Sequence, residues 1–199
     1  MTTTRQILAF NRVTADGYFS DLDGSLSWVV PEPDVDRAAA GSSDADTILF
    51  GRKTYELFES FWPGALADPD LAPDPHAGGQ PSPEQRNFAV MLNRMTKLVF
   101  SRSRKDVSWN NSRILGELDV REVEALKRQP GGNILIFGSS SIVSQLTTHG
   151  LIDEYLFVVS PTFLGSGRSL INVPTPVSLR LLDLKQFPSG TLMIRYGRA

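Results

Sequence analysis

Cysteine is absent from the 199-residue chain, so the sequence can form neither a disulfide nor a metal site built from thiolates. Histidine is also scarce. Only His76 and His149 occur, far apart in the sequence, and neither has a second histidine at a helical spacing. A histidine-based zinc site needs several ligands close together. We therefore expect no metal site.

Long hydrophobic runs and a strong excess of either charge are missing as well. No apolar stretch approaches the roughly 20 residues that a membrane-spanning helix needs. The first residues, MTTTRQILAFNR, lack the apolar core of a signal peptide. The formal net charge is −2, whereas domains that bind nucleic acid usually carry a basic excess. The sequence thus predicts a cytoplasmic protein whose partners are neither membranes nor nucleic acids.

The composition that remains is that of a globular domain, with 41% hydrophobic and 21% charged residues. A chain of this length fits one domain, and we predict a single domain over residues 1–199. Residues 63–83 stand apart because Pro, Asp, Ala and Gly recur in them. They indicate a surface excursion, which is either an insertion without function or a lid over a site.

Short apolar runs alternate with helix-like segments. The runs typical of buried strands are residues 7–10, 47–50, 97–100, 112–115, 133–137 and 155–160. The helix-like segments are residues 34–43, 53–61, 120–127 and 141–149. Apolar strands separated by helices favour a parallel sheet covered on both faces. Near the C-terminus, two extended runs flank Pro188-Ser189-Gly190 and indicate a hairpin. We predict an α/β fold whose mostly parallel sheet ends in an antiparallel pair.

Three predicted strands end in a phenylalanine that small, hydroxyl-bearing or cationic residues follow. These residues are Gly51, Arg52, Lys53 and Thr54; Ser101, Arg102, Ser103 and Arg104; and Gly138, Ser139, Ser140 and Ser141. Ligands of open α/β sheets bind outside the carboxyl ends of the strands, where helix N-terminal amides attract anions and glycine permits close approach. Each segment alone is also typical of an ordinary turn. Together they predict a site for a ligand with several phosphates, such as a dinucleotide, although neither a Walker A loop nor a GxGxxG fingerprint is present.

Acidic residues offer several candidates for a polar anchor. Asp16 follows the first predicted strand in VTADGYFSDLDGSLSW. It either forms an ordinary turn or faces a pocket, where a carboxylate can bind ring N–H donors or manage a proton. Glu32, Asp34 and Asp36 compete for this role, but they also suit the first turn of a helix. The glycine-containing loop over residues 160–171 either shapes a site or simply turns the chain.

Taken together, the segments resemble the reductase-type domain of the bifunctional deaminase-reductase family of riboflavin biosynthesis. The resemblance runs nearly end to end and rests on TADGYFSDLDGSLSW, ILFGRKTYELF, KLVFSRS, ILIFGSSSIVSQL and GLIDEYLFVVSPTFLGSGRSLI. It implies a dihydrofolate reductase-like fold in three layers, NADPH as cofactor and a homodimer. The zinc deaminase half of that family has no counterpart, because an H-x-E with P-C-x-x-C pattern requires cysteine.

The resemblance also implies roles for individual residues. Gly51, Arg52, Lys53 and Thr54 would hold phosphates. Ser101 and Arg102, in one Ser-Arg-Ser step with Ser103, would receive the 2′-phosphate. Gly138, Ser139, Ser140 and Ser141 would lie against the pyrophosphate or the nicotinamide, and Asp16 would face the substrate.

The expected reaction is hydride transfer to a pteridine, a ribosylaminopyrimidine or a similar small heterocycle, as in 5-amino-6-(5-phosphoribosylamino)uracil reductase. Two alternatives remain open. One is a nucleotide-binding or regulatory module without catalysis. The other is a true dihydrofolate reductase, although none of Glu32, Asp34 and Asp36 matches its helix acid cleanly.

Overall fold

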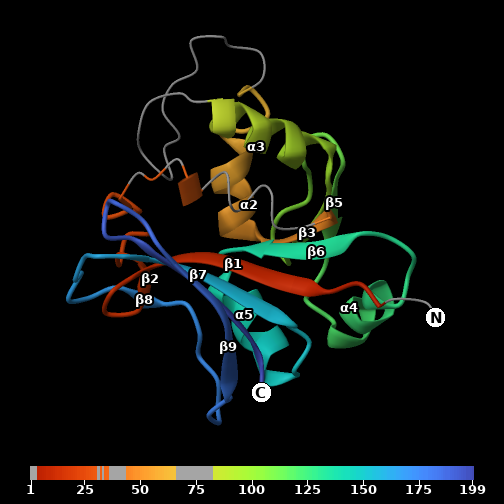
Figure 1. Cartoon of the computed structure of the whole chain (residues 1–199). Coiled ribbons are helices and arrows are strands. Elements are labelled where there is room, and N and C mark those ends of the chain that lie inside the picture. The colour runs from red at the N-terminus through yellow and green to blue at the C-terminus, as the bar shows by residue number, and fades with distance from the viewer. Residues whose placement is uncertain (1–3, 31, 33, 36–43, 66–82) are drawn as a thin grey trace.

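The computed structural model of the chain describes residues 4–30, 32, 34–35, 44–65 and 83–199 (Figure 1). An eight-stranded sheet lies at its centre, in the order β5-β4-β3-β6-β1-β7-β10-β9. Neighbouring strands are parallel from β5 to β7, and β10 and β9 then run antiparallel. The strands are β1 (Ile7–Thr14), β3 (Ala45–Gly51), β4 (Thr96–Phe100), β5 (Ser112–Leu115), β6 (Asn133–Phe137), β7 (Glu154–Ser160), β9 (Leu179–Gln186) and β10 (Leu192–Arg198). The predicted α/β class and the antiparallel C-terminal pair are confirmed.

Helices cover both faces of the sheet and make three layers (Figure 1). On one face lie α2 (Arg52–Glu59) and α3 (Pro83–Arg94), and on the other lie α4 (Val120–Lys127) and α5 (Ser140–Thr148). Successive side chains of a strand point to opposite faces. Ile48 and Phe50 therefore pack in the core beneath α2 and α3, while Leu49 packs in the core beneath α5. Consecutive apolar residues in β3 thus serve two cores.

Some elements were not predicted. Helix α3 has Phe88, Ala89 and Leu92 at helical spacing behind a proline at its first position, a pattern typical of a helix start. A separate two-stranded sheet pairs β2 (Tyr18–Ser20) with β8 (Arg168–Ser169). Of the helix predicted over residues 34–43, only residues 34 and 35 are described, and both are helical. Most of the predicted excursion, residues 66–82, lies outside the described residues.

Strand β1 is longer than the apolar run over residues 7–10, and its extra length bears on the site. It continues through Asn11 and Arg12 to Thr14, two residues before Asp16. The continuation is possible because β7 pairs with β1 as far as Thr14. Strand β6 stops earlier, at Phe137, which lies opposite Phe10. Beyond Phe10, therefore, none of the described strands pairs with β1 on the side of β6.

Over the described parts of the chain, no helix has both the length and the apolar character needed to cross a membrane. Within the same residues, no group of three or more histidine or acidic side chains is placed to hold a metal ion.

Candidate functional site

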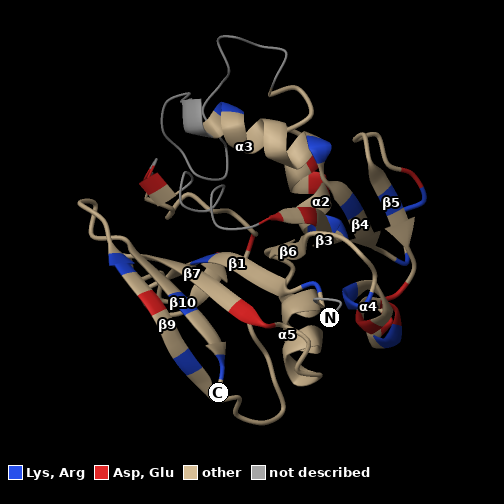
Figure 2. Ribbon diagram, turned by 45° about the vertical axis from the view of Figure 1, so that its right-hand side comes forward, with Lys and Arg blue, Asp and Glu red and all other residues tan. Residues whose placement is uncertain are grey.

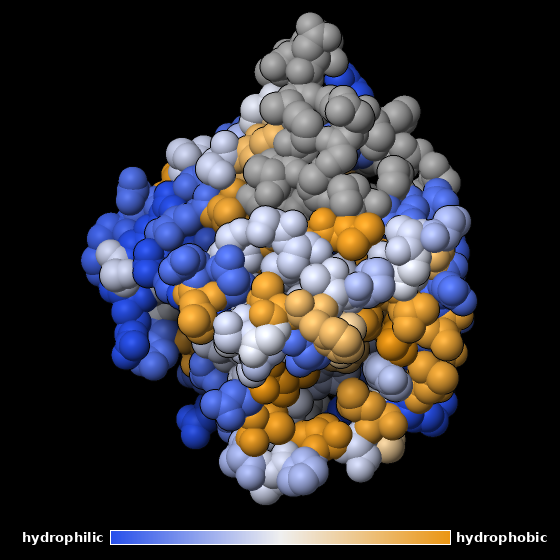
Figure 3. Space-filling model, turned by 90° about the vertical axis from the view of Figure 1, so that its left-hand side faces the viewer, coloured by the Kyte–Doolittle hydropathy of each residue, from blue (hydrophilic) through white to orange (hydrophobic). Residues whose placement is uncertain are grey.

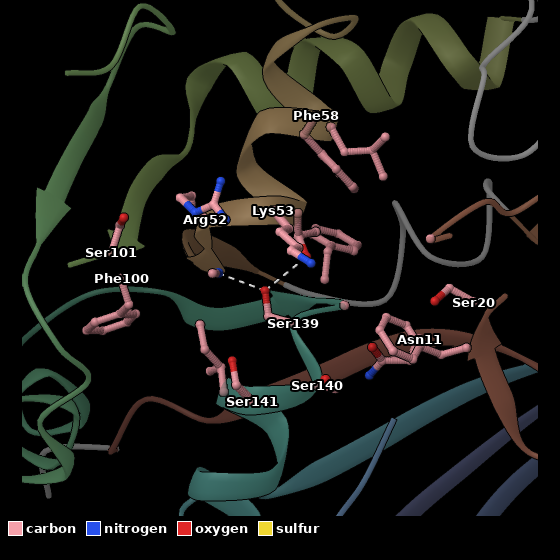
Figure 4. Close-up of a pocket in the computed structure, with 18 of the residues that line it drawn as sticks. Asn11, Ser20, Arg52, Lys53, Phe58, Phe100, Ser101, Ser139, Ser140 and Ser141 are labelled. Atoms are coloured by element: carbon pink, nitrogen blue, oxygen red, sulfur yellow. Dashed lines mark hydrogen bonds between the residues drawn. The ribbon is translucent and has the colours of Figure 1, made fainter. Parts of the chain in front are cut away.

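The carboxyl ends of β4, β3, β6 and β1 open onto one cavity of about 970 Å³. All eleven residues predicted to bind the cofactor line this cavity, and Figure 4 shows part of the arrangement. They are Gly51, Arg52, Lys53, Thr54, Ser101, Arg102, Ser103, Gly138, Ser139, Ser140 and Ser141. The structure therefore brings together three segments that are distant in the sequence.

Two helices begin at this cavity without the usual capping side chains. Helix α2 starts after Gly51 and helix α5 starts after Ser139, and neither start has a side-chain cap or an acidic residue in its first turn. The first N–H groups of a helix have no partner within the helix, and they carry partial positive charge. Both helix starts are consequently suited to an anionic ligand.

A short chain of hydrogen bonds fixes the two helix starts to each other. The Gly51 N–H donates to Ser139 Oγ over 2.7 Å, and the Ser139 hydroxyl donates to Thr54 Oγ1 over 3.0 Å (Figure 4). Gly138 and Ser139 both have left-handed backbone, with φ of 58° and 59°. This conformation is unfavourable for serine and needs support from its surroundings. Since the Ser139 hydroxyl already donates its hydrogen to Thr54, it has none left for an anionic ligand, and the side chain positions the two helix starts instead.

The four predicted cations, Arg52, Lys53, Arg102 and Arg104, differ in how free their side chains are to bind a ligand. Arg52 pairs with Glu56 one turn along α2 at 3.0 Å, and charges of both signs lie along this helix in Figure 2. Arg104 pairs with Glu59 at 2.6 Å and does not line the cavity. The Arg102 side chain is 81% exposed and lies 3.9 Å from Glu117. Lys53 is exposed, with no ion pair or hydrogen bond of its side chain among the described residues. Arg102 and Lys53 are thus the cations best placed to meet a ligand.

Glu59 holds the loop that follows β4 against α2. Its carboxylate accepts hydrogen bonds from the Ser108 N–H and hydroxyl, from Arg104 and from the Tyr55 hydroxyl. Burial by itself would raise the pKa of Glu59, but these hydrogen bonds lower it to about 2. The backbone N–H of Arg104 also donates to Ser101 Oγ over 2.9 Å. The loop bearing Ser101 and Arg102 is therefore firmly anchored.

Aromatic side chains line the part of the cavity nearest α2 and α3. The rings of Phe58 and Phe137 are stacked with centroids 5.6 Å apart, and Phe88 meets Phe137 edge-on at 5.7 Å. Phe10 and Trp62 line the same cavity. The space-filling view shows hydrophobic and hydrophilic residues side by side on one face (Figure 3). The cavity thus combines a cationic end with a wall that suits a flat apolar ring.

Asp16 lies outside the set of cavity-lining residues. It accepts hydrogen bonds from the Thr14 hydroxyl and from the N–H groups of Leu164 and Gly165, the last two at 3.1 and 2.8 Å. The Thr14 hydrogen bond is the main cause of the lowered pKa of Asp16, and the two N–H groups add to it. Asp16 therefore fastens the loop after β7 to the end of β1. The prediction that it faces a substrate finds no support in this geometry.

The competing acids also lie away from the cavity. The Glu32 carboxylate accepts a hydrogen bond from the Ser189 hydroxyl at 2.7 Å, and neither Glu32 nor Asp34 lines the cavity. Asp36 is outside the described residues. The loop over residues 160–171 does reach the rim, because Arg168 lines the cavity and donates to the Leu22 carbonyl oxygen at 2.6 Å. Of the acids predicted as substrate anchors, none that the structure describes lines the cavity; the described acids that do line it are Asp23 and Glu117.

Residues 5–193 match the RibD C-terminal domain. The chain belongs to this family. Two relatives from Bacillus subtilis strain 168 are the uncharacterized proteins YyaP, 28% identical over 197 residues, and YwjB, 27% identical over 201 residues. The match to YyaP covers 96% of this chain and 94% of YyaP, and the match to YwjB covers 98% and 99%.

Solved structures show the same fold at low sequence identity. A pyrimidine reductase-like protein from Corynebacterium diphtheriae has a TM-score of 0.65 at 16% identity, covering 98% of this chain and 92% of its own. Dihydrofolate reductase from Enterococcus faecalis, complexed with NADP(H), has a TM-score of 0.63 at 14% identity, with coverage of 97% and 96%. RibD from Acinetobacter baumannii has a TM-score of 0.65 at 16% identity, and this chain spans 59% of it. The dihydrofolate reductase-like fold is confirmed.

Several cavity residues of this RibD-type domain were not predicted from the sequence. Phe58 belongs to the helix predicted over residues 53–61 but had no predicted role in the site. Trp62 lies just after that segment, and Phe88 belongs to the helix that was not predicted. Asn11 lies in the extension of β1, where a polar residue in an apolar run was the one signal. That signal marks a buried polar side chain without saying what it binds.

Proposed function

We propose that this RibD-type domain is an NADPH-dependent reductase acting on a small heterocycle of the pteridine or ribosylaminopyrimidine type. The observation that carries the proposal is the two-ended cavity. Two uncapped helix starts, Arg102 and Lys53 gather at one end, and an aromatic wall lines the other. The names of its structural relatives, a pyrimidine reductase-like protein and an NADP(H) complex of dihydrofolate reductase, agree with this chemistry.

The residues present suit NADPH. An added Cβ at Gly51 would lie 2.9 Å from Ser139 Oγ, so glycine lets the starts of α2 and α5 approach each other closely. Neither start has a side-chain cap, and their N–H groups would hold the diphosphate. Arg102, with Ser101 and Ser103, would hold the 2′-phosphate. When bound, NADPH supplies the hydride. The chain's own residues would orient cofactor and substrate against the aromatic wall and exclude water from the reacting atoms.

The proposal is tested by following NADPH absorbance at 340 nm with a panel of pteridines, dihydrofolate and ribosylaminopyrimidines. We expect consumption of NADPH with at least one pteridine or ribosylaminopyrimidine. NADPH binding without consumption on the whole panel would favour a nucleotide-binding module. Activity confined to dihydrofolate would favour a true dihydrofolate reductase, and the acid would then have to be sought among Glu32, Asp34 and Asp36.

Replacing Arg102 with alanine should weaken NADPH binding by roughly tenfold or more, because a charge-assisted hydrogen bond contributes about 1.5–3 kcal/mol. NADH affinity should hardly change, since NADH lacks the 2′-phosphate. Calorimetric titration of both nucleotides measures the difference. Arg180→Ala is the matched control, because Arg180 is an exposed arginine on β9 away from the cavity. Equal losses for NADPH and NADH in the Arg102 variant would place the 2′-phosphate elsewhere.

We also propose that the protein is a homodimer, as the family resemblance implies. Sedimentation velocity would show a species of twice the chain mass, and a species of 21.9 kDa at micromolar concentration would contradict this.

A further inference from the structure

Asn11 carries a buried side-chain amide. The residue is 3% exposed, and neither Oδ1 nor Nδ2 has a partner among the described residues. Leaving a buried donor and acceptor unpaired is costly, and native proteins rarely do so without reason. Asn11 also lines the large cavity, and Figure 4 shows its amide turned toward the start of α5, where Ser140 lies. A ligand group that enters this part of the cavity can satisfy it.

The position of Asn11 along the sheet edge indicates which part of a ligand it meets. The strands run in the order β4, β3, β6, β1, so Asn11 lies three strand spacings, roughly 14 Å, from the β4 end that carries Arg102. The starts of α2 and α5 follow β3 and β6, which lie between these two ends. A dinucleotide with phosphates at β4 and between the two helices therefore brings its uncharged end to β1.

The face of the sheet to which Asn11 points indicates whether its side chain meets the cofactor or the substrate. Side chains alternate along β1, and Ala9 and Val13 pack in the core with Ile142 and Val143 of α5. Asn11 points to the same face as Ala9 and Val13. The aromatic wall that suits a flat substrate is formed from the α2 and α3 face. The amide consequently faces the helix start assigned to the cofactor and not the substrate wall.

We propose that the Asn11 side chain binds the carboxamide of the nicotinamide ring. Two primary amides are complementary, because Nδ2–H of Asn11 can donate to the carboxamide oxygen while Oδ1 accepts from the carboxamide NH2. The assignment rests on the proposed use of NADPH. It makes Asn11 a positioning residue for the ring that carries the hydride, and it explains why β1 keeps a polar residue in a buried run.

The test compares NADPH with 2′-phospho-ADP-ribose, which lacks the nicotinamide, by calorimetric titration of the full chain and of Asn11→Leu. Leucine matches asparagine in size and removes both polar groups. We expect Asn11→Leu to bind NADPH about tenfold more weakly and 2′-phospho-ADP-ribose unchanged, because two neutral hydrogen bonds are lost with the first ligand only. Without ligand the variant should melt at a higher temperature, since an unpaired buried amide is gone. A purely structural asparagine would give a lower melting temperature.

A second comparison changes the ligand as well as the protein. The reduced 3-acetylpyridine analogue of NADPH replaces the carboxamide NH2 with a methyl group, and it should bind the wild-type chain several-fold more weakly than NADPH. In Asn11→Leu the two dinucleotides should bind equally. The inference would be overturned if the substitution weakened the binding of NADPH and 2′-phospho-ADP-ribose equally. It would also be overturned if the wild-type chain bound NADPH and its 3-acetylpyridine analogue with equal affinity. If neither NADPH nor 2′-phospho-ADP-ribose binds the wild-type chain, the proposed function itself is wrong.

Discussion

Replacing Gly51 with valine is expected to weaken NADPH binding by about a hundredfold. The added Cβ would lie 2.9 Å from Ser139 Oγ and 3.2 Å from its Cβ. The Oγ can turn about χ1, but the Cβ is attached directly to the backbone, and valine adds two further methyl groups. The start of α5 must then move away from α2, and the hydrogen bond from the Gly51 N–H to Ser139 is lost. Phosphate contacts that depend on both helix starts are charge-assisted, each contributing about 1.5–3 kcal/mol. Calorimetric titration with NADPH measures the loss.

The control for this experiment is Gly64→Val. Gly64 is exposed, and the one atom of the described residues within 4 Å of an added Cβ there would be the Phe61 carbonyl oxygen, at 3.8 Å. We expect this variant to bind NADPH normally, and circular dichroism should show that both variants remain folded. Unchanged affinity in a folded Gly51→Val protein would mean that no phosphate lies between the two helix starts.

Glu59→Gln is expected to lower the free energy of unfolding by about 2–3 kcal/mol at pH 7 and to remove part of the acid sensitivity. The folded-state pKa of Glu59, about 2, is below its ordinary value of 4.5. The charged carboxylate therefore adds stability above pH 4.5, and this contribution disappears as the pH falls from about 4.5 to about 2. The expected loss follows because a tenfold change in a proton-binding constant corresponds to about 1.4 kcal/mol. The Glu59 side chain is only 13% exposed, so little of the effect is screened by solvent.

Urea unfolding of both proteins at pH 7, 4 and 2.5 tests this expectation. The difference in unfolding free energy between wild type and Glu59→Gln should shrink steadily toward pH 2.5, because the charge of Glu59 is progressively lost. The other carboxylates titrate in both proteins and cancel in the difference. Glu56→Gln is the matched control, since the Glu56 side chain is 40% exposed and pairs with Arg52 on the helix surface. Surface pairs contribute about 0–1 kcal/mol. A Glu59→Gln protein that keeps the full wild-type acid dependence would show that the loop after β4 is anchored by other contacts.

The sequence predicted which segments line the cationic end of the cavity, because the signals of those segments are local. A strand, a small residue and a helix start follow one another directly at Gly51 and at Gly138, and α/β geometry then brings the strand ends together. The place of Asn11 in the cavity could not be predicted in this way, because it depends on contacts between segments that are distant in the sequence. Strand β1 reaches Asn11 only because β7 pairs with it there.

The role of Asp16, the acid predicted to anchor the substrate, also depends on contacts that are distant in the sequence. The sequence around Asp16 cannot reveal that its carboxylate binds the N–H groups of Leu164 and Gly165, which lie 148 and 149 positions away. A carboxylate in an Asp-Gly turn has the same local signal whether it faces a pocket or fastens a distant loop. Only the folded arrangement distinguishes the two.

The most direct test of the central claim is a calorimetric titration of the wild-type chain with NADPH and, separately, with NADH. The cavity has two uncapped helix starts for a diphosphate and an exposed Arg102 for a further phosphate. We predict that NADPH binds with one site per chain and that NADH binds at least about tenfold more weakly. If neither nucleotide binds, or if both bind equally well, the assignment of this cavity to NADPH is contradicted.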